Sequence, residues 1–307
     1  MYQYLLRRTL IAIGLVFTIM AVVFIMLRVA LPGDPAVVLA GDRASPELIA
    51  QIRENLGLDR PILEQLALFM VRAVQGDLGR SVKFGEPVFG VILKAFPFTL
   101  LLTFLSVGIG TAIGLGVGVL TAVKHGTWID KVSIVFVVFF YSIPTFWLGT
   151  MLILLFAVAW RMLPVQGAET WQHFVLPVTT LSIGEAAFIA RLTRANMLEA
   201  LSAPYVQTAR SKGLVERRVV FVHALRNTLI PVITVVGLSM GSLLGGAVIT
   251  ESIFGLPGVG RLSIQAILDR DYPMIQGTVL LVAVAFVFVN LLVDVIYTYI
   301  DPRIRFN

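Results

Sequence analysis

Apolar residues dominate long stretches of this chain, and six of these stretches are long enough, or nearly long enough, to cross a bilayer. A membrane-spanning helix takes about 20 mostly apolar residues. The stretches cover residues 9–31, 95–123, 132–159, 175–190, 229–250 and 275–300. The fourth is the shortest and carries Pro177, Gly184 and Glu185. The pattern predicts an all-α integral membrane protein with six transmembrane helices.

The first apolar stretch follows Arg7 and Arg8, an arrangement that secretory signal peptides share. The apolar core of a signal peptide has about 7–15 residues, and a small-residue cleavage site follows it. The run here is longer, and no such site follows. We therefore expect a retained transmembrane helix.

Composition agrees with this interpretation. Of the 307 residues, 58% are hydrophobic and 14% are charged, whereas an ordinary globular domain has about 25% charged residues. Too few charged groups remain to cover a water-facing surface, which excludes soluble Rossmann or barrel enzymes and disordered tails. The chain has no cysteine, so disulfides, thiolate nucleophiles and Cys-ligated metals are excluded as well.

The net charge of +6 is distributed unevenly along the chain. Lys and Arg together outnumber Asp and Glu in residues 1–8, 124–131, 191–228 and 301–307, and the reverse holds in residues 32–93, 160–174 and 251–274. Because cytoplasmic loops carry the excess of Lys and Arg, the first set and both termini are predicted to be cytoplasmic. The basic surplus then reflects topology rather than nucleic-acid binding.

The long outer loop, residues 32–93, contains two predicted helices. Ser45 and Pro46 are typical of a helix start, and Gly57 ends this first helix. A second amphipathic helix follows Pro61. Its predicted apolar side consists of Leu63, Leu66, Phe69, Met70 and Ala73.

Glycines recur every four residues in the second and fifth stretches. They are Gly110, Gly114, Gly118, Gly237, Gly241 and Gly245. Small residues at this spacing let transmembrane helices approach closely, so we predict tight helix pairs. Residues 237–241 also match the G-x-S-x-G motif of serine hydrolases. That motif requires a strand–turn–helix elbow, which an apolar helix does not provide, and we reject the hydrolase interpretation.

Glu185 is the most informative ionisable residue within a predicted span. Intramembrane carboxylates either face a water-filled path or pair with a cation. Arg191 and Arg194 follow on the same stretch, so both roles remain open.

The predicted cytoplasmic segment 191–228 has a helix–glycine–helix organisation. Pro204 can start a short helix, and Gly213 can end it. A second helix from Val215 would place Val215, Val219 and Val222 along one stripe. The seven basic residues of the segment would by themselves indicate anchoring or contact with anionic lipid. The compact organisation indicates an element presented to a protein partner.

Residues 205–213 are YVQTARSKG, and residues 223–231 are HALRNTLIP. They resemble the cytoplasmic "EAA" loop of permease subunits of binding-protein-dependent ABC importers, in the dipeptide, oligopeptide, nickel and glutathione branch. Further matches are LPGDP at 31–35, GDLGRS at 76–81, PGVGR at 257–261, RDYP at 270–273 and DPRIR at 301–305. The resemblance covers essentially the whole chain.

This resemblance implies a type I ABC importer transmembrane domain at residues 94–303, after an N-terminal helix (1–31) and an extracytoplasmic helical loop (32–93). It implies that segment 191–228 holds coupling helices that dock into a groove on an ATP-hydrolysing subunit. The implied coupling positions are Tyr205, Thr208, Ala209, Arg210, Lys212 and Gly213, with Arg217, Arg218 and Asn227 in support. The family's Glu-Ala-Ala is Gln-Thr-Ala here, so no salt bridge is expected from position 207.

The sequence contains no Gly-x-x-x-x-Gly-Lys-Ser/Thr phosphate loop. We therefore expect a non-catalytic permease with no cofactor or metal of its own, and ATP and Mg²⁺ in partner subunits. The resemblance implies a second homologous permease, two ABC ATPases and an extracytoplasmic solute-binding protein at a bacterial or archaeal cytoplasmic membrane. Small peptides are the expected substrate, with nickel or glutathione as alternatives.

ATPase closure would rock the permease between inward-open and outward-open states. The candidates for the translocation path are Tyr141, Ser142, Pro144 and Glu185. The competing class is an ATP-independent channel or secondary transporter, which should carry several mid-membrane carboxylates. Here Glu185 alone is approximately central. An intramembrane protease would need H-E-x-x-H or a Ser/His pair, and neither is evident.

Overall fold

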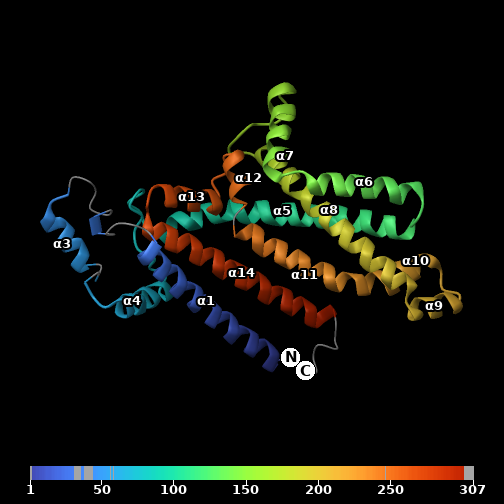
Figure 1. The fold of residues 1–307 in the computed structure, drawn as a ribbon, viewed down its shortest axis with the longest axis horizontal. Coiled ribbons are helices and arrows are strands. Elements are labelled where there is room, and N and C mark those ends of the chain that lie inside the picture. Colours follow the sequence, from blue (N-terminus) through green and yellow to red (C-terminus); the bar gives the residue numbers. More distant parts are fainter. Residues whose placement is uncertain are drawn as a thin grey trace.

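The computed structural model describes residues 2–30, 36–37, 44–55, 57, 59–245 and 247–300. Every regular element in those ranges is a helix, apart from an isolated bridge between Arg80 and Pro87. The long helices lie side by side and run roughly along one direction (Figure 1). Helices satisfy their backbone hydrogen bonds internally, as a bilayer requires. The all-helical prediction is confirmed.

Five helices in the described residues are long and apolar enough to cross a membrane. They are α1 (Tyr2–Ala30), α5 (Val88–Val123), α8 (Gln172–Ser202), the continuous helix of α10 (Glu216–Arg218), η2 (Val219–Ala224) and α11 (Leu225–Leu244), and α14 (Tyr272–Ile300). A sixth span arises if α6 (Trp128–Ser142) is counted with α7 (Thr145–Leu152) and the π-helix η1 (Ile153–Ala159). The bend between α6 and α7 is 97°.

The fourth span is much longer than the predicted stretch 175–190, because α8 continues through residues 191–202. Thr193, Met197 and Ala200 lie on one face of this extension and are buried. Met197 and Ala200 pack with Val220 in one apolar cluster. The sequence assigned these residues to a loop because of their basic neighbours. The apolar face, repeating at helical spacing, explains why the helix continues.

The first glycine series joins α5 to α8. A Cβ on Gly114 would lie 2.7 Å from the Ile189 Cβ, and a Cβ on Gly118 would lie 2.5 Å from the Thr193 Cβ. Both distances are far below van der Waals contact. The absence of side chains on this face of α5 therefore sets the distance between the two helices, and the predicted close packing is confirmed.

The second series joins α11 to α14. A Cβ on Gly241 would lie 2.5 Å from the Phe286 ring, and one on Gly237 would clash with Val293. Gly245 is not closed off by α14, because a Cβ there would meet Val282 at an ordinary 3.5 Å, and its tightest contact, 3.1 Å, is with the Ser242 carbonyl of the preceding turn. Two of the three glycines thus define the close approach.

The segment predicted as the outer loop contains the two predicted helices, α3 (Pro46–Asn55) and α4 (Ile62–Val74). The Leu48 amide donates to the Ser45 hydroxyl at 3.3 Å, which is the expected N-cap. Phe69 of α4 stacks on Phe24 of α1, with ring centroids 5.7 Å apart. On the predicted apolar side, Leu66, Phe69, Met70 and Ala73 are partly buried, whereas Leu63 is 74% exposed.

Two of the sequence motifs, 76–81 and 270–273, meet in the structure. Asp271 is 1% exposed, and its carboxylate accepts hydrogen bonds from the Ser81 hydroxyl and from the Lys83 and Met274 amides. This carboxylate fixes the loop before α5 to the start of α14. The motifs at 31–35 and 301–305 lie outside the described residues.

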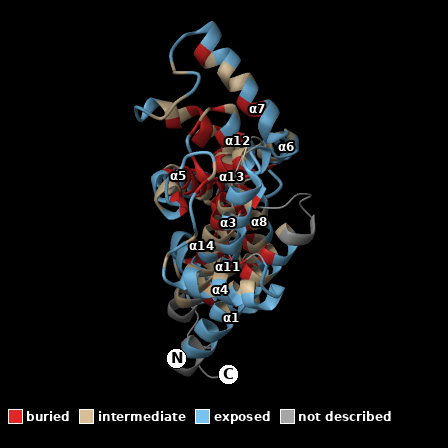
Figure 2. Ribbon diagram, turned by 90° about the vertical axis from the view of Figure 1, so that its left-hand side faces the viewer, coloured by how far each residue is buried: buried red, intermediate tan, exposed pale blue. Residues whose placement is uncertain are grey.

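A buried carboxylate also holds the short helices α12 (Val248–Ile253) and α13 (Val259–Leu268), where buried residues concentrate in Figure 2. Glu251 is 0% exposed. Its Oε1 accepts from the Thr99 hydroxyl at 2.6 Å, and its Oε2 accepts from the Arg261 amide at 2.8 Å. The Val259 amide donates to Thr99 Oγ1 at 2.8 Å. The carboxylate therefore joins α12, the start of α13 and α5.

Glu251 lies outside the helices that are long enough to span a membrane. Burial raises the pKa of its carboxyl above the ordinary value, and hydrogen bonds from Thr99 and from the amides of Arg261 and Gly260 oppose this effect. Burial is the larger influence. The carboxyl group is thus enclosed by protein, where each hydrogen bond to it matters.

Candidate functional site

The first helix of the predicted helix–glycine–helix element is α9 (Pro204–Ser211), which lies at one end of the long helices (Figure 1). Gly213 and α10 follow it. Pro204 is in the first turn, where its missing N–H costs nothing. Gly213 follows the helix with φ of +76°, in the left-handed region that favours glycine. The predicted start and end of this helix are confirmed.

α9 is held against η2 by a small apolar cluster. Val206, Ala209 and Val219 are buried together, with Leu214 packed against them. Of the coupling candidates, Ala209 therefore faces inward. Its side chain fixes α9 to the next helix and leaves the opposite side of α9 exposed.

Two polar contacts brace the element. The Asn227 amide nitrogen donates to the Tyr205 hydroxyl at 2.8 Å, so two candidates 22 positions apart are brought together. Arg210 pairs with Glu216 across the turn at Gly213, with Nη2 2.6 Å and Nε 3.1 Å from the two carboxylate oxygens. Both side chains are exposed, and such a surface pair contributes about 0–1 kcal/mol. The pair therefore positions the turn more than it stabilises the fold.

The remaining coupling candidates are exposed. Thr208 donates to the Pro204 carbonyl at 3.0 Å within its own helix, and Lys212 is exposed. Arg217 and Arg218 border an open groove of about 550 Å³, whose other lining residues are Val215, Phe221 and Val222. A basic rim beside exposed apolar side chains fits contact with a protein surface that carries acidic groups.

The predicted stripe of Val215, Val219 and Val222 is wrong. Val219 is buried, whereas Val215 is 74% and Val222 is 50% exposed. Residues 219–224 form the π-helix η2, whose wider turns shift the positions that share a face. An α-helical spacing rule cannot anticipate that shift.

Three of the path candidates lie where the chain bends. Tyr141 and Ser142 end α6, and Pro144 precedes α7 at the 97° break. All three are exposed. The Ser142 hydroxyl donates to the Val138 carbonyl of its own helix at 2.8 Å.

Tyr141 contacts two α8 residues that the sequence did not single out for the path. Its ring stacks on Phe188 with centroids 6.1 Å apart, and the Arg191 guanidinium lies 4.7 Å from the Tyr141 ring centroid. A cation over an aromatic face is a favourable arrangement. Glu185, Phe188 and Arg191 follow one another at intervals of three residues. This spacing places them on one face of α8, and it was the sequence signal that could have identified Phe188 and Arg191.

The fourth candidate, Glu185, lies on α8 facing α5 and α11. A Cβ on Gly110 of α5 would lie 2.7 Å from the Glu185 Cβ, and Ser239 of α11 lies near the carboxyl group. Its Oε1 is buried without a hydrogen-bond partner. The two suggested ion pairs are not formed, because Arg194 pairs with Asp130 and Arg191 covers Tyr141.

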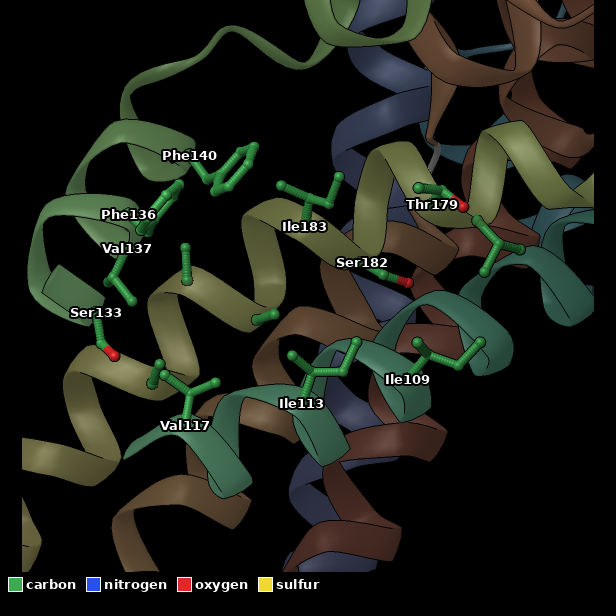
Figure 3. Close-up of a pocket in the computed structure, with 14 residues that line it drawn as sticks. Ile109, Ile113, Val117, Ser133, Phe136, Val137, Phe140, Thr179, Ser182 and Ile183 are labelled. Carbon is green, nitrogen blue, oxygen red and sulfur yellow. The ribbon is translucent and has the colours of Figure 1, made fainter. Parts of the chain in front are cut away.

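An apolar cleft of about 430 Å³ lies between α5, α6 and α8. Figure 3 shows Phe136 and Phe140 of α6 on one side, Ile183 of α8 beside them, and Ile109 and Ile113 of α5 below. Two hydroxyl groups in its wall donate to backbone carbonyls. Thr179 donates to Val175 of its own helix at 2.7 Å, and Ser182 donates to Ser106 of α5 at 3.0 Å.

Comparison with known proteins agrees with this architecture. Residues 114–306 match the family described as "Binding-protein-dependent transport system inner membrane component", and residues 1–103 match its N-terminal component. The chain therefore belongs to this family. It is a membrane permease subunit of an ABC importer, a multi-pass protein of the cytoplasmic membrane. Such subunits are not catalytic, and ATP is hydrolysed by partner subunits.

Two relatives cover the whole chain. The glutathione transport system permease protein GsiC of Escherichia coli (strain K12) is 42% identical over 307 residues, 100% of both chains. The probable peptide ABC transporter permease protein y4tP of Sinorhizobium fredii (strain NBRC 101917 / NGR234) is 41% identical over 311 residues, 99% of both chains. The family resemblance inferred from the motifs is confirmed.

A solved structure shares the fold. The inward-facing MetNI methionine ABC transporter has a TM-score of 0.59 at 23% identity, covering 70% of this chain and 99% of that chain. This likeness concerns the fold alone. It supports the type I importer architecture predicted for the transmembrane helices.

Proposed function

We propose that this chain forms half of the translocation path of an ATP-driven importer of small peptides, and that α9 is its coupling helix. The main support is the position of α9 at the end of α8, turned back at Gly213 and exposed on its outer side. In this proposal α9 and both termini face the cytoplasm. The start of α1 and the end of α14 lie on the same side of the molecule as α9 in Figure 1.

The proposed partners are a second homologous permease, two ABC ATPases that bind ATP and Mg²⁺, and an extracytoplasmic solute-binding protein. Tyr205, Thr208, Arg210 and Lys212 would contact an ATPase, with Arg217 and Arg218 at the rim. Ala209, Gly213 and Asn227 would shape the element. Because α9 is packed on η2, a displacement of α9 would move α8 and α11 together.

Small peptides are the proposed substrate class. One relative is named for glutathione and another for peptide transport, and glutathione is itself a tripeptide. We propose that the path passes Tyr141, Ser142, Pro144 and Glu185. Tyr141 is exposed, whereas the Glu185 Oε1 is buried without a hydrogen-bond partner, so a polar solute would reach this oxygen only after the helices around it move apart.

The substrate is tested with the complete complex reconstituted in vesicles together with its binding protein. We expect dialanine to stimulate ATP hydrolysis several-fold over the substrate-free rate. Stimulation by glutathione alone, or by Ni²⁺ alone, would replace the peptide assignment by the corresponding alternative. Co-purification without any ATPase subunit would contradict the coupling proposal itself.

Gly213→Val tests the coupling role of the turn. A β-branched residue at φ of +76° carries a backbone penalty of about 1–2 kcal/mol, so the turn would rearrange and tilt α9. We expect binding-protein-stimulated ATPase activity and transport to fall about tenfold or more, while the permease still inserts. Gly85→Val is the matched control, because Gly85 has a φ of +65° and open space around it in the outer loop. Equal losses in both variants would argue against a coupling role.

A further inference from the structure

An ion pair with a buried carboxylate joins the start of α6 to the last third of α8. The Asp130 side chain is 3% exposed. Its Oδ1 accepts from Arg194 Nε at 2.8 Å, and its Oδ2 accepts from Arg194 Nη2 at 3.0 Å. The Gly126 amide also donates to Oδ2 at 3.0 Å, and His125 Nδ1 lies 3.0 Å from the same oxygen. A two-pronged pair of this kind fixes orientation as well as distance.

This pair joins parts of the chain that the proposed mechanism uses separately. Arg194 lies on α8, the helix that leads directly into α9. Asp130 lies in the first turn of α6, which ends at Tyr141, Ser142 and the bend before α7. The pair therefore bridges the proposed coupling end of α8 and the helix that ends at two path candidates, just before the third, Pro144.

The packing between α6 and α8 makes this bridge important. At the far end of α6, Tyr141 stacks on Phe188. Between this contact and the ion pair, α6 lines the apolar cleft of about 430 Å³ with Ser133, Phe136, Val137 and Phe140 (Figure 3), and the α8 wall of the cleft extends from Val178 to Ala190. Surfaces that face a cleft lack the dense contacts that transmit displacement in a packed core. The polar bridge and the aromatic contact therefore carry the mechanical connection along this stretch.

We infer that Asp130 and Arg194 form a positioning pair that makes α6 follow α8 when the coupling helix is displaced. ATP-driven movement of α9 would then reach the bend at Pro144 through α8, the ion pair and α6. The inference rests on the proposed coupling role of α9. It assigns no contact with ATP or with substrate to either residue.

Asp130→Asn tests this inference in the reconstituted complex with its ATPases and binding protein. Asparagine keeps the size of the side chain but removes the charge. We expect binding-protein-stimulated ATP hydrolysis to persist, and solute transported per ATP to fall about tenfold, with dialanine and glutathione measured side by side. Lys131→Gln, an exposed neighbour, is the control and should retain the wild-type ratio.

The double variant Asp130→Asn/Arg194→Gln separates a pair from two independent residues. Residues that act as one unit give non-additive effects, so the double variant should lose no more coupling than Asp130→Asn alone. A purely structural role predicts instead that ATPase activity and transport fall together with the amount of intact complex. That result, or a wild-type transport ratio in Asp130→Asn, would overturn the inference.

A distance measurement provides a second, independent test. The chain has no cysteine, so spin labels can be placed at Val135 on α6 and Glu199 on α8, both of them exposed. In the wild-type background, the label distance should stay constant between the nucleotide-free and ATP-trapped complexes. In Asp130→Asn the distribution of label distances should broaden, or its mean should change, on ATP binding. If α6 and α8 separate in the wild type, the inference fails. If α9 labels show no ATP-dependent movement at all, the coupling proposal fails instead.

Discussion

Glu251→Ala is expected to loosen α12 and α13 and to destabilise the permease by about 3 kcal/mol or more. Removing the carboxylate leaves the Thr99 hydroxyl and the Arg261 amide without their acceptor in a fully buried site. Each buried donor left unpaired costs about 1–3 kcal/mol. The variant should show a lower melting temperature in detergent and faster amide exchange in α13.

The control for this substitution is Glu86→Gln. Glu86 is exposed and pairs with Lys94 at 2.8 Å, and we expect the melting temperature of that variant to be unchanged. If Glu251→Ala melts like the wild type, water enters the site freely and the carboxylate does not join α12 and α13 to α5. Faster exchange confined to α13 would locate the weakened contact.

Alanine at both Gly114 and Gly118 is expected to force α5 away from α8. The new Cβ atoms would lie 2.7 Å from the Ile189 Cβ and 2.5 Å from the Thr193 Cβ. Neither contact involves the flexible end of a long side chain. Overpacking of this kind costs about 1–3 kcal/mol per site. The melting temperature should fall further than in either single variant.

The matched control for the glycine pair lies on the same helix. A Cβ at Gly116 has nothing within 4 Å, so Gly116→Ala should melt at the wild-type temperature or slightly above it, since alanine favours helix. Transport assays on the same samples would show whether the close face is also needed for movement. Equal melting of Gly116→Ala and the double variant would contradict the proposed packing.

The sequence predicted much of the candidate site because the relevant features are local. Pro204 and Gly213 set where α9 begins and ends through their own backbone preferences. The N-cap at Ser45 also depends only on neighbouring residues. The four-residue glycine spacing predicted close helix pairs without naming the partner helices. The extension of α8 to Ser202 was missed because its basic residues suggested a loop. The π-helical shift at 219–224 was missed because the expected period was wrong.

The contacts that assemble the path candidates could not be predicted in this way. Tyr141 meets Phe188 and Arg191 only because α6 and α8 cross at that level. Glu185 was correctly singled out as a costly charge in a span, but its neighbours on α5 and α11 depend on how three helices pack. The sequence offered Arg191 or Arg194 as partners, and tertiary packing gave both arginines other contacts.

By itself the sequence determined the class of architecture, the approximate spans and the short helix that ends at Gly213. Hydrophobic length and turn chemistry act within a few residues, so they can be deduced from the chain alone. The tertiary structure decided which buried charges are paired. Asp130 meets Arg194 across 64 positions, and Thr99 meets Glu251 across 152. A buried charge needs a partner, but only the packing of the helices determines which residue that partner is.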